Sequence, residues 1–390
     1  MSGGVLSFVD DTWTLDLLRS LLRADSQNPP GHEAAAAQVV AEALTGLGLR
    51  VRSIEVEPGR PNVVAELPGD DPESLLLNGH LDTVTIGDPD AWHYDPFGEV
   101  SAGRCYGRGS CDMKGGLAAM IGAVAAVVHS GMPRRRSLLL TAVIDEEVWF
   151  KGTQSLLDDG LLTNCSRAYI SEPTSLSIAT SLQGAAEFTA RIDGVAAHTG
   201  MAELGRNAII GMNHLVAALD SYHQSLRGTG QRFGLPVDPS VNVGSIAGGS
   251  GVTLVPDACT LSFDRQFLPG EDQSAAITEI EQIFHSVCAQ YDLTGQLTLD
   301  QSFPSWSIDP QSPEVRDLTA AHTQASNSPA QTSIFRAYVE IELLHRAGIP
   351  GAIYGPGSII QAHRPDEYVP LSEVATATRT YALATAAFLR

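Results

Sequence analysis

Carboxylate and imidazole side chains recur along the chain in short segments that are rich in small residues. The segment Gly107 to Gly116 reads Gly-Arg-Gly-Ser-Cys-Asp-Met-Lys-Gly-Gly and contains one carboxylate, Asp112. Glycines let the backbone approach a ligand closely, and the apolar run that follows is typical of a buried helix, whose N-terminus favours a negative charge. A carboxylate held in this way can bind two metal ions at once. Taken alone, such a loop is more often an ordinary turn.

A second segment, Gly79-His80-Leu81-Asp82-Thr83, places a histidine and an aspartate two positions apart. In an extended backbone these two side chains point to the same side. A histidine that binds a metal usually donates its other ring proton to a carboxylate, which fixes the ring. His80 is therefore a candidate ligand and Asp82 its hydrogen-bond partner. The alternative is a Gly-His turn followed by an aspartate that caps a helix.

Three carboxylates in a row, Asp145-Glu146-Glu147, follow an apolar run. Charges at the end of a buried strand are costly unless cations neutralise them, so cations are expected nearby. The alternative is a solvated acidic loop. Two further candidates are Glu172, between Ser and Pro, and His363, between Ala and Arg. Neither would be a candidate without the other segments, and a lone histidine is usually structural or exposed.

The elements that must position these residues alternate between helical and strand-like patterns. Alternating helices and wholly apolar strands predict an α/β fold with a mixed sheet that helices cover on both faces. Ligands bind such sheets beyond the carboxyl ends of the strands, where three of the candidate segments fall. The predicted helices are 12–22, 33–47 and 117–128, and the predicted strands are 50–57, 62–67, 74–78, 137–144 and 168–170.

The pattern changes near Ser181 to the order βαββαβ, which is typical of a ferredoxin-like unit. It is inserted, because helix and apolar strand resume afterwards. We therefore predict a catalytic domain formed by residues 1–180 and 300–390, and an inserted lid domain over 181–299. The predicted lid strands are 184–193, 240–247, 259–267 and 293–299, its helices are 207–226 and 272–291, and the later elements are helix 333–347, strand 349–354 and helix 372–389.

Composition excludes some classes of function. A chain of 390 residues favours two domains, and 43% hydrophobic with 18% charged residues indicates a globular protein. The net charge of −21 repels nucleic-acid backbones and anionic membranes, so neither is expected as a partner. Five scattered cysteines without a Cys-x-x-Cys pair suit a reducing compartment, and Cys111 is interpreted as a small buried residue. No secretion signal is visible, so we expect a cytoplasmic protein.

The candidate segments, in their order along nearly the whole chain, resemble the M20 metallopeptidase family. This family includes aminoacylases, acetylornithine deacetylases, succinyl-diaminopimelate desuccinylases and glutamate carboxypeptidases. Besides the segments above, the resemblance rests on Glu172-Pro173-Thr174, Ala197-His198, Gly205-Arg206-Asn207-Ala208, Asp264-Arg265 with Pro269-Gly270-Glu271, and His363 to Val369.

The resemblance implies a dinuclear metal site at the carboxyl ends of the strands. One ion would be held by His80, Asp112 and Glu172, and the other by Asp112, Glu147 and His363, so that Asp112 bridges the two. Imidazole and carboxylate ligands at open sites suit Zn²⁺, with Co²⁺ or Mn²⁺ as possible substitutes. Two dications would balance the charge of three carboxylates and a bridging hydroxide.

The resemblance also implies catalytic and substrate-binding roles. Glu146 would be the general base that takes a proton from the bridging water and delivers it to the leaving amine, with Asp82 orienting the histidine ligand. His198, from the inserted domain, would stabilise the oxyanion in the partner's site of a dimer. Arg265 would grip the substrate's carboxylate, although a surface salt bridge is the alternative. Asn207 is assigned to substrate binding.

Several positions differ from those usual in the family, and all are places where substrates are selected. Small residues usually follow the catalytic glutamate, but here Trp149 does so closely. Ala202 stands where Pro is frequent, and Thr253 where Asn is frequent. An aspartate often precedes the late helix, whereas no Asp lies between residue 318 and Asp366.

The expected activity is hydrolysis of the amide bond of an N-acyl amino acid or a related small amide, by a cytoplasmic homodimer that dimerises through the inserted domain. A dipeptidase or carboxypeptidase of the same family would use the same metal centre and is the alternative within the enzyme class. A non-catalytic binding protein on this scaffold is the alternative from another class. Such a protein is expected to have lost Glu146 or a metal ligand, and this chain retains them all.

Overall fold

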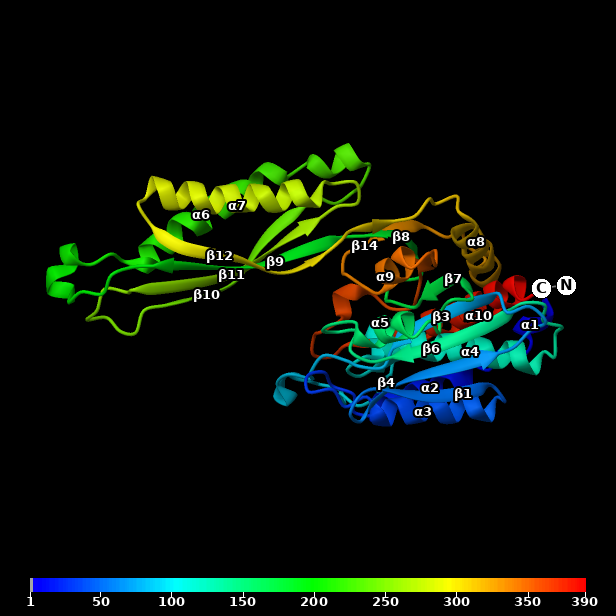
Figure 1. Cartoon of the computed structure of the whole chain (residues 1–390). Helices are drawn as coiled ribbons and strands as arrows, with labels where there is room; N and C mark the ends of the chain where they lie inside the picture. Colours follow the sequence, from blue (N-terminus) through cyan, green and yellow to red (C-terminus); the bar gives the residue numbers. More distant parts are fainter. Residues whose placement is uncertain (1–2) are drawn as a thin grey trace. The chain divides into compact units, whose positions relative to one another are not determined.

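The computed structural model of the chain describes residues 3–390 and divides into two compact units, which Figure 1 shows. Unit 1 contains the chain up to Thr180 together with Ile308–Phe335 and Val339–Arg390, and unit 2 contains Ser181–Ser307 and Arg336–Tyr338. The second unit extends beyond the predicted limit at residue 299. The reason is that its last long strand, β12 (Thr294–Phe303), is longer than predicted and is followed by the short strand β13 (Trp306–Ser307).

Within residues 3–390, the main sheet of unit 1 belongs to a nine-stranded mixed sheet. The strand order is β1-β2-β6-β3-β7-β15-β8-β13, and β14 pairs with β8. Strand β3 is parallel to both β6 and β7, and β7 is parallel to β15. The bounds are β1 Arg50–Glu57, β2 Arg60–Leu67, β3 Ser74–His80, β6 Ser137–Val143, β7 Cys165–Ile170, β8 Ile178–Leu182, β14 Thr332–Phe335 and β15 Gly351–Ile353.

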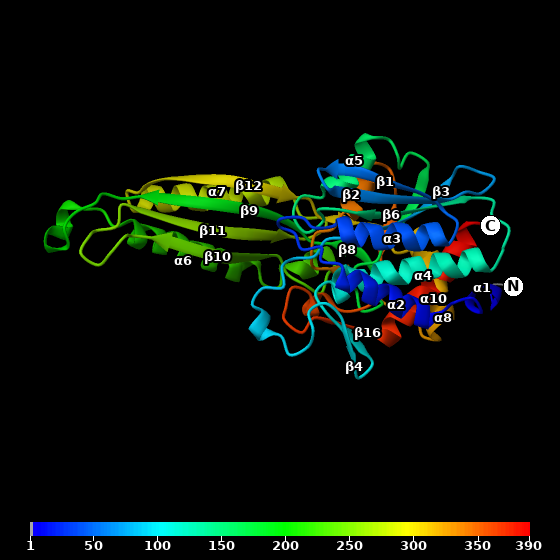
Figure 2. The same ribbon diagram turned by 90° about the horizontal axis from the view of Figure 1, so that it is seen from below.

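The central strands consist largely of apolar residues, and they are therefore stable where helices and neighbouring strands bury them completely. Strands β3 and β6 are buried at every position, as expected for parallel strands covered on both faces. Figure 2 shows α2, α3, α4 and α10 over the strands of unit 1. These helices span Asp11–Arg23, Ala34–Gly46, Gly115–His129 and Leu371–Phe388. The predicted fold class, a mixed sheet between helices with an inserted lid, is confirmed.

Helix α4 is the most apolar helix of unit 1. Together with the turn before it, over Ser110–His129, it is long and apolar enough to cross a membrane by composition, but 94% of its most apolar window is buried inside the protein. Such burial is typical of the core helix of a globular domain. Helix α4 begins at Gly115, three residues after Asp112. Because the helix is buried in the core, it holds the segment that carries this carboxylate in place.

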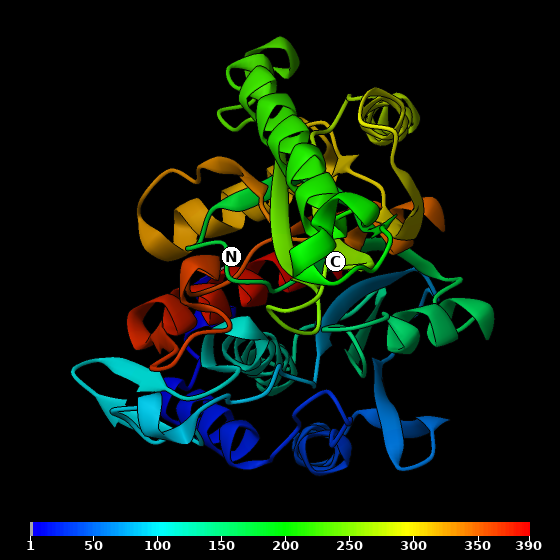
Figure 3. The same ribbon diagram turned by 90° about the vertical axis from the view of Figure 1, so that its left-hand side faces the viewer.

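Unit 2 has the predicted βαββαβ order. Its four-stranded sheet has the order β10-β11-β9-β12, and its core contains side chains of both helices. Figure 3 shows α6 (green) and α7 (yellow-green) as two separate rods. The bounds are β9 Gly184–Asp193, α6 Ala208–Leu226, β10 Ser240–Gly248, β11 Ala258–Phe267 and α7 Gln273–Gln290.

The predicted helix over 333–347 is wrong. Residues Thr332–Phe335 form strand β14, and the helix that follows, α9, spans only Ile341–Arg346. The stretch contains Thr, Ile and Phe, which fit a strand as well as a helix, and β14 pairs with strand β8. Three further α-helices of the described residues were not predicted, α1 (Gly3–Leu6), α5 (Lys151–Asp158) and α8 (Pro313–Ser326).

A small three-stranded sheet joins two segments that are far apart in the sequence. Strand β16 (Tyr368–Pro370) pairs with β5 (Arg104–Tyr106), which pairs with β4 (Glu99–Ser101). Because β5 leads into the glycine-rich loop and β16 follows His363, this pairing brings the late histidine next to the segment that contains Asp112.

Candidate metal centre

Three neighbouring parallel strands deliver most of the candidate residues to one edge of the sheet. His80 is the last residue of β3, the turn of residues 145–147 follows β6, and Glu172 follows β7. Because β3 is parallel to both neighbours, their carboxyl ends lie at the same edge, where α/β proteins bind ligands. Asp112 reaches this edge from the start of α4, and His363 reaches it from the segment held by β16.

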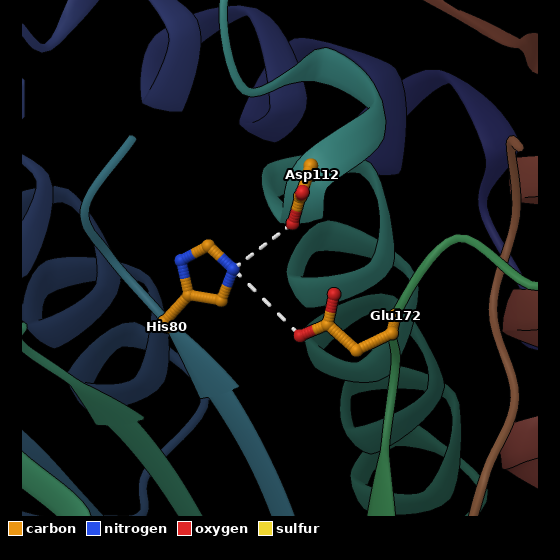
Figure 4. Close-up of side chains that lie close together, drawn as sticks. All are labelled: His80, Asp112 and Glu172. Atoms are coloured by element: carbon orange, nitrogen blue, oxygen red, sulfur yellow. Dashed lines mark hydrogen bonds and ion pairs between the residues drawn. The ribbon is translucent and has the colours of Figure 1, made fainter. Parts of the chain in front are cut away.

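The first group of ligand atoms comes from His80, Asp112 and Glu172. The Nε2 atom of His80 lies 3.2 Å from Oδ1 of Asp112 and 3.7 Å from Oε1 of Glu172. Figure 4 shows the imidazole directed toward both carboxylates. All three residues are buried, so an ion held there would be shielded from bulk water.

The second group comes from Asp112, Glu147 and His363. The Nε2 atom of His363 lies 3.1 Å from Oε2 of Glu147 and 3.5 Å from Oδ2 of Asp112. The two oxygens of Asp112 thus face different histidines. In each group the ligand atoms lie within 4.8 Å of one another. The structure therefore assembles the two predicted ligand sets, with Asp112 common to both.

The electrostatics of this edge fit divalent cations. Burial, and next the charge of Asp112, raise the pKa of Glu172 well above its usual value. Burial and Asp112 also raise the pKa of Glu147. Oε1 of Glu172 is buried and has no hydrogen-bond partner among the described residues. A buried carboxylate oxygen without a donor is costly, and metal ions at the two groups would remove this cost.

Glu146 lies beside the first group but belongs to neither set. Its Oε2 atom is 3.9 Å from Nε2 of His80, and the residue is buried. Burial raises the pKa of Glu146 well above its usual value; His80 opposes this shift, and Glu172 adds to it. A carboxyl group that binds a proton readily and remains free of the ligand sets is suited to general acid–base chemistry.

Asp82 has a role that differs in part from the predicted one. The ring atom Nδ1 of His80 is 2.9 Å from the backbone carbonyl oxygen of Asp82, whereas the Asp82 carboxylate is 3.6 Å away. The carbonyl thus holds the ring proton on Nδ1 and leaves Nε2 for a ligand. The carboxylate instead accepts hydrogen bonds from the backbone N–H groups of Glu146 and Glu147, both at 3.1 Å. Asp82 therefore joins β3 to the turn that carries both glutamates.

A buried ion pair that the sequence analysis did not identify holds the glycine-rich loop. Glu367 pairs with Arg108 and accepts hydrogen bonds from the backbone N–H groups of Cys111 at 3.0 Å and Asp112 at 3.2 Å. Burial raises the pKa of Glu367 to about 7, although Arg108 opposes this shift. Arg108 and Glu367 both lie in segments on which the family resemblance rests, but the sequence did not show that they pair. Cys111 is buried, as predicted.

Glu340 is a further buried carboxylate near the centre. It directly precedes α9, is wholly buried, and accepts hydrogen bonds from Asn78 Nδ2 at 3.2 Å and Thr153 Oγ1 at 3.1 Å. Burial raises its pKa to about 7. A buried carboxylate thus lies directly ahead of α9, although the sequence has no aspartate there.

Two predicted residues, His198 and Asn207, belong to unit 2. His198 is exposed, and its Nδ1 atom accepts a hydrogen bond from the backbone N–H of Gly200 at 3.0 Å. Asn207 caps helix α6, where its Oδ1 atom accepts from the N–H groups of Ile209 and Ile210. Capping occupies the carbonyl end of the Asn207 side chain, and its assignment to substrate binding stays a prediction.

Arg265 is placed differently from the prediction. It lies on β11, whose buried and half-buried residues alternate, and its position is on the buried face between Phe263 and Phe267. The guanidinium group is wholly buried, pairs with Glu271, and lies over the ring of Phe267 at 5.1 Å. It is therefore already paired inside unit 2. This arrangement does not support the predicted contact with a substrate carboxylate, nor is the pair on the surface.

The fold and the site define a metal-dependent hydrolase with two adjacent ligand sets. Residues 76–387 match the family model described as Peptidase family M20/M25/M40. This match spans well over half of the chain, and the chain therefore belongs to that family. Its members are metal-dependent.

Named relatives support a hydrolase that acts on amide bonds. The chain is 27% identical to N-formyl-4-amino-5-aminomethyl-2-methylpyrimidine deformylase of Bacillus subtilis, over 94% of this chain and 92% of the relative. It is 29% identical to acetylornithine deacetylase of Aliivibrio fischeri, over 84% of each. Among solved structures, a tripeptidase from Staphylococcus aureus matches with a TM-score of 0.81 and 19% identity, over 97% of this chain and 99% of that chain. The last likeness bears on the fold alone.

The buried position of Arg265 predicts that its loss destabilises the protein. Arg265→Ala would leave Glu271 without its partner, and breaking a buried pair costs about 3–5 kcal/mol. Thermal unfolding should show a large fall in the melting temperature. Arg191→Ala is the control, because its pair with Asp193 is half exposed and should contribute less than about 1 kcal/mol. A variant of normal stability with a raised KM for free-acid substrates would instead support the predicted substrate contact.

The histidine pKa values predict proton release on metal binding. Hydrogen bonds with Asp112 and Glu147 raise the pKa of His363 to about 10, and although burial opposes it, acidic neighbours raise the pKa of His80 well above its usual value. Both rings are thus protonated near neutral pH without metal, whereas a ligating imidazole must be neutral. Zn²⁺ titration in buffers of different ionisation enthalpy should show a net release of protons, and affinity should rise with pH. Binding without proton release would contradict this account.

Proposed function

We propose that this protein is a dinuclear metal-dependent hydrolase that cleaves the amide bond of an N-acyl amino acid or a related small amide. The observation that carries the proposal is Asp112, which offers one oxygen to each of two ligand sets, while the free carboxyl of Glu146 lies beside the first. Zinc is the ion that the imidazole and carboxylate ligands suit best, with Co²⁺ or Mn²⁺ as substitutes. A cytoplasmic location stays a prediction.

The chain's own residues divide the work of amide hydrolysis. Two divalent ions, when bound, would polarise the amide carbonyl and lower the pKa of a water molecule. Glu146 takes the proton from the attacking water and passes it to the amine nitrogen as the C–N bond breaks. Asp82 holds the backbone of the turn on which Glu146 lies, so that this proton moves along a short path.

The named relatives favour an N-acyl group over a peptide. The deformylase and the deacetylase remove small acyl groups, as their names state. A dipeptidase or carboxypeptidase of the same family is the second candidate. The same metal centre would serve either substrate. The residues around it that bind the rest of the substrate therefore decide which of the two is cleaved. Retention of every predicted ligand and of Glu146 argues against a non-catalytic binding protein.

Unit 2 carries features that support a homodimer. Strand β10 is an edge strand of its sheet, and a long edge with unpaired backbone groups readily pairs with another chain. Large apolar side chains are exposed on this strand and nearby, where a second copy of the chain would cover them. They are Ile209, Ile210, Val243, Ile246 and Val252.

Replacement of Glu146 tests the proposed chemistry. Glu146→Gln keeps the size of the side chain but cannot accept the proton, so we expect kcat to fall by a factor of about 10² to 10⁴ with metal content unchanged. The assay should compare N-formyl, N-acetyl, N-succinyl, N-carbamoyl and dipeptide substrates with Zn²⁺ present. Full turnover by the variant would show that another group moves the proton. Preferential cleavage of dipeptides by the wild type would favour the second candidate.

The proposed dimer predicts a selective effect at one edge of the lid sheet. Ile246→Lys places a charge on the exposed face of β10, where it should oppose association and leave the fold intact. Sedimentation velocity should show a dimer for the wild type and a monomer for this variant. Leu299→Lys is the matched control, because Leu299 is also exposed but lies on the opposite edge strand, β12. A monomeric wild type at micromolar concentration would refute the dimer.

A further inference from the structure

A buried hydrogen-bond network lies behind the metal centre and contains none of the metal ligands. It runs from Asp82 through the side-chain amide of Asn28 to Asp145, and from there to Arg60 and Glu33. All five residues are buried, with at most 8% of each exposed. Only Asp82 and Asp145 belong to segments that the sequence singled out.

Asn28 bridges two carboxylates with one amide group. Its Nδ2 atom lies 2.9 Å from Oδ2 of Asp82 and 3.0 Å from Oδ1 of Asp145. An asparagine amide has two N–H donors, so it can serve both acceptors at once. The backbone holds Asn28 in place, because its N–H donates to the carbonyl oxygen of Thr83 at 2.8 Å. The position of the amide is thus tied to the end of strand β3.

Asp145 is the strained residue of the turn that carries the two glutamates. Its φ angle is +64°, a left-handed conformation that few residues other than glycine adopt without support. The support comes from Arg60, whose guanidinium donates to Oδ1 of Asp145 at 3.1 Å and forks onto Glu33. Arg60 therefore brings a positive charge into a network that contains three carboxylates.

We propose that Asn28 and Arg60 are positioning residues that fix the turn of residues 145–147 and thereby place Glu147 as a ligand and Glu146 as a base. The proposal rests on the proposed function. Asp82 binds the backbone N–H groups of Glu146 and Glu147, and Arg60 binds the side chain of Asp145. Asn28 is the only group among the described residues that donates a side-chain hydrogen bond to both Asp82 and Asp145.

The two N–H donors of the Asn28 side chain can be removed with little change of shape. Asn28→Asp has nearly the same shape, but it replaces an N–H donor with an oxygen that faces two carboxylates. The turn should then move away from its present place. Residues that orient metal ligands through hydrogen bonds typically change metal affinity by 10- to 100-fold when replaced. The ligand set that contains Glu147 should be affected more than the set that contains Glu172.

The experiment is a titration of the metal-free protein with Co²⁺, followed by the visible absorption of the bound ion. Wild type should bind two equivalents. Asn28→Asp should bind the second equivalent at least 10-fold more weakly, with an altered spectrum for that ion, and should lose kcat with a smaller change in KM. Asn164→Asp makes the same chemical change at an exposed position and should behave as wild type. Two equivalents bound by Asn28→Asp with wild-type affinity and spectrum would overturn the proposal.

A second variant keeps the proposal open to refutation if Asn28→Asp does not fold. Arg60→Lys retains the charge but not the planar fork that reaches Asp145 and Glu33 together. It should weaken the second Co²⁺ equivalent in the same direction, whereas Arg136→Lys, at a half-exposed pair with Glu73, should not. Wild-type binding by a folded Arg60→Lys would count against the network.

The outcomes separate this proposal from the proposed function. If wild type bound no Co²⁺ and cleaved no amide, the proposed function would fail. If wild type bound two ions and hydrolysed amides while Asn28→Asp and Arg60→Lys matched it in the titration, only the positioning role would fail.

Discussion

The crowding of negative charge at one buried edge of a sheet is the constraint on which the rest of this structure depends. Four carboxylates lie within 3.9 Å of the Nε2 atom of His80 or of His363, namely those of Asp112, Glu146, Glu147 and Glu172. Without cations, burial raises the pKa values of the glutamates. Such a cluster is costly unless counter-charges fill it, and the shared aspartate allows two ions to do so in a small volume.

The fold keeps this crowded edge in place with rigid elements rather than with the ligands themselves. Helix α4 is packed so closely that a Cβ atom at Gly116 would lie 2.0 Å from the carbonyl oxygen of Ser171, the residue before Glu172. Glu367 holds the backbone of the glycine-rich loop, and Asp82 holds the turn after β6. The segments that carry Asp112 and Glu147 thus each have a buried carboxylate that binds their backbone, which preorganises these two ligands.

Unit 2 shows how the same residue types serve a different purpose when the core surrounds them. The segment from Asp264 to Glu271 carries Arg265, which the family resemblance assigned to the substrate's carboxylate. Strand alternation places Arg265 between Phe263 and Phe267, on the face that the helices cover, and Glu271 closes the pair. The alternation Phe-x-Arg-x-Phe in the sequence indicates the buried face for Arg265, whereas the family resemblance implied a contact with substrate.

Local sequence determined the elements whose residues are uniform over their length. The apolar strands β3 and β6, helix α4 and the alternating strands β9 and β11 were predicted close to their observed bounds, because each pattern has one favourable way to bury its side chains. The resemblance of the motifs to the M20 family implied which residues form the two ligand sets. The short and mixed stretch from Thr332 to Arg346 was predicted wrongly, because pairing of β14 with β8, and not local propensity, decided the structure of its first residues.

Tertiary structure alone decided which groups hold the ligands in place. Asn28, Arg60 and Glu33 lie far from Asp82 and Asp145 in the sequence, and their own segments carry no pattern that marks them. Hydrogen bonds between side chains depend on distances of a few tenths of an ångström, which arise only when separate elements pack together. For the same physical reason, the sequence could name Asp82 as a partner of His80 but not show that the backbone carbonyl makes the contact and the carboxylate holds the neighbouring turn.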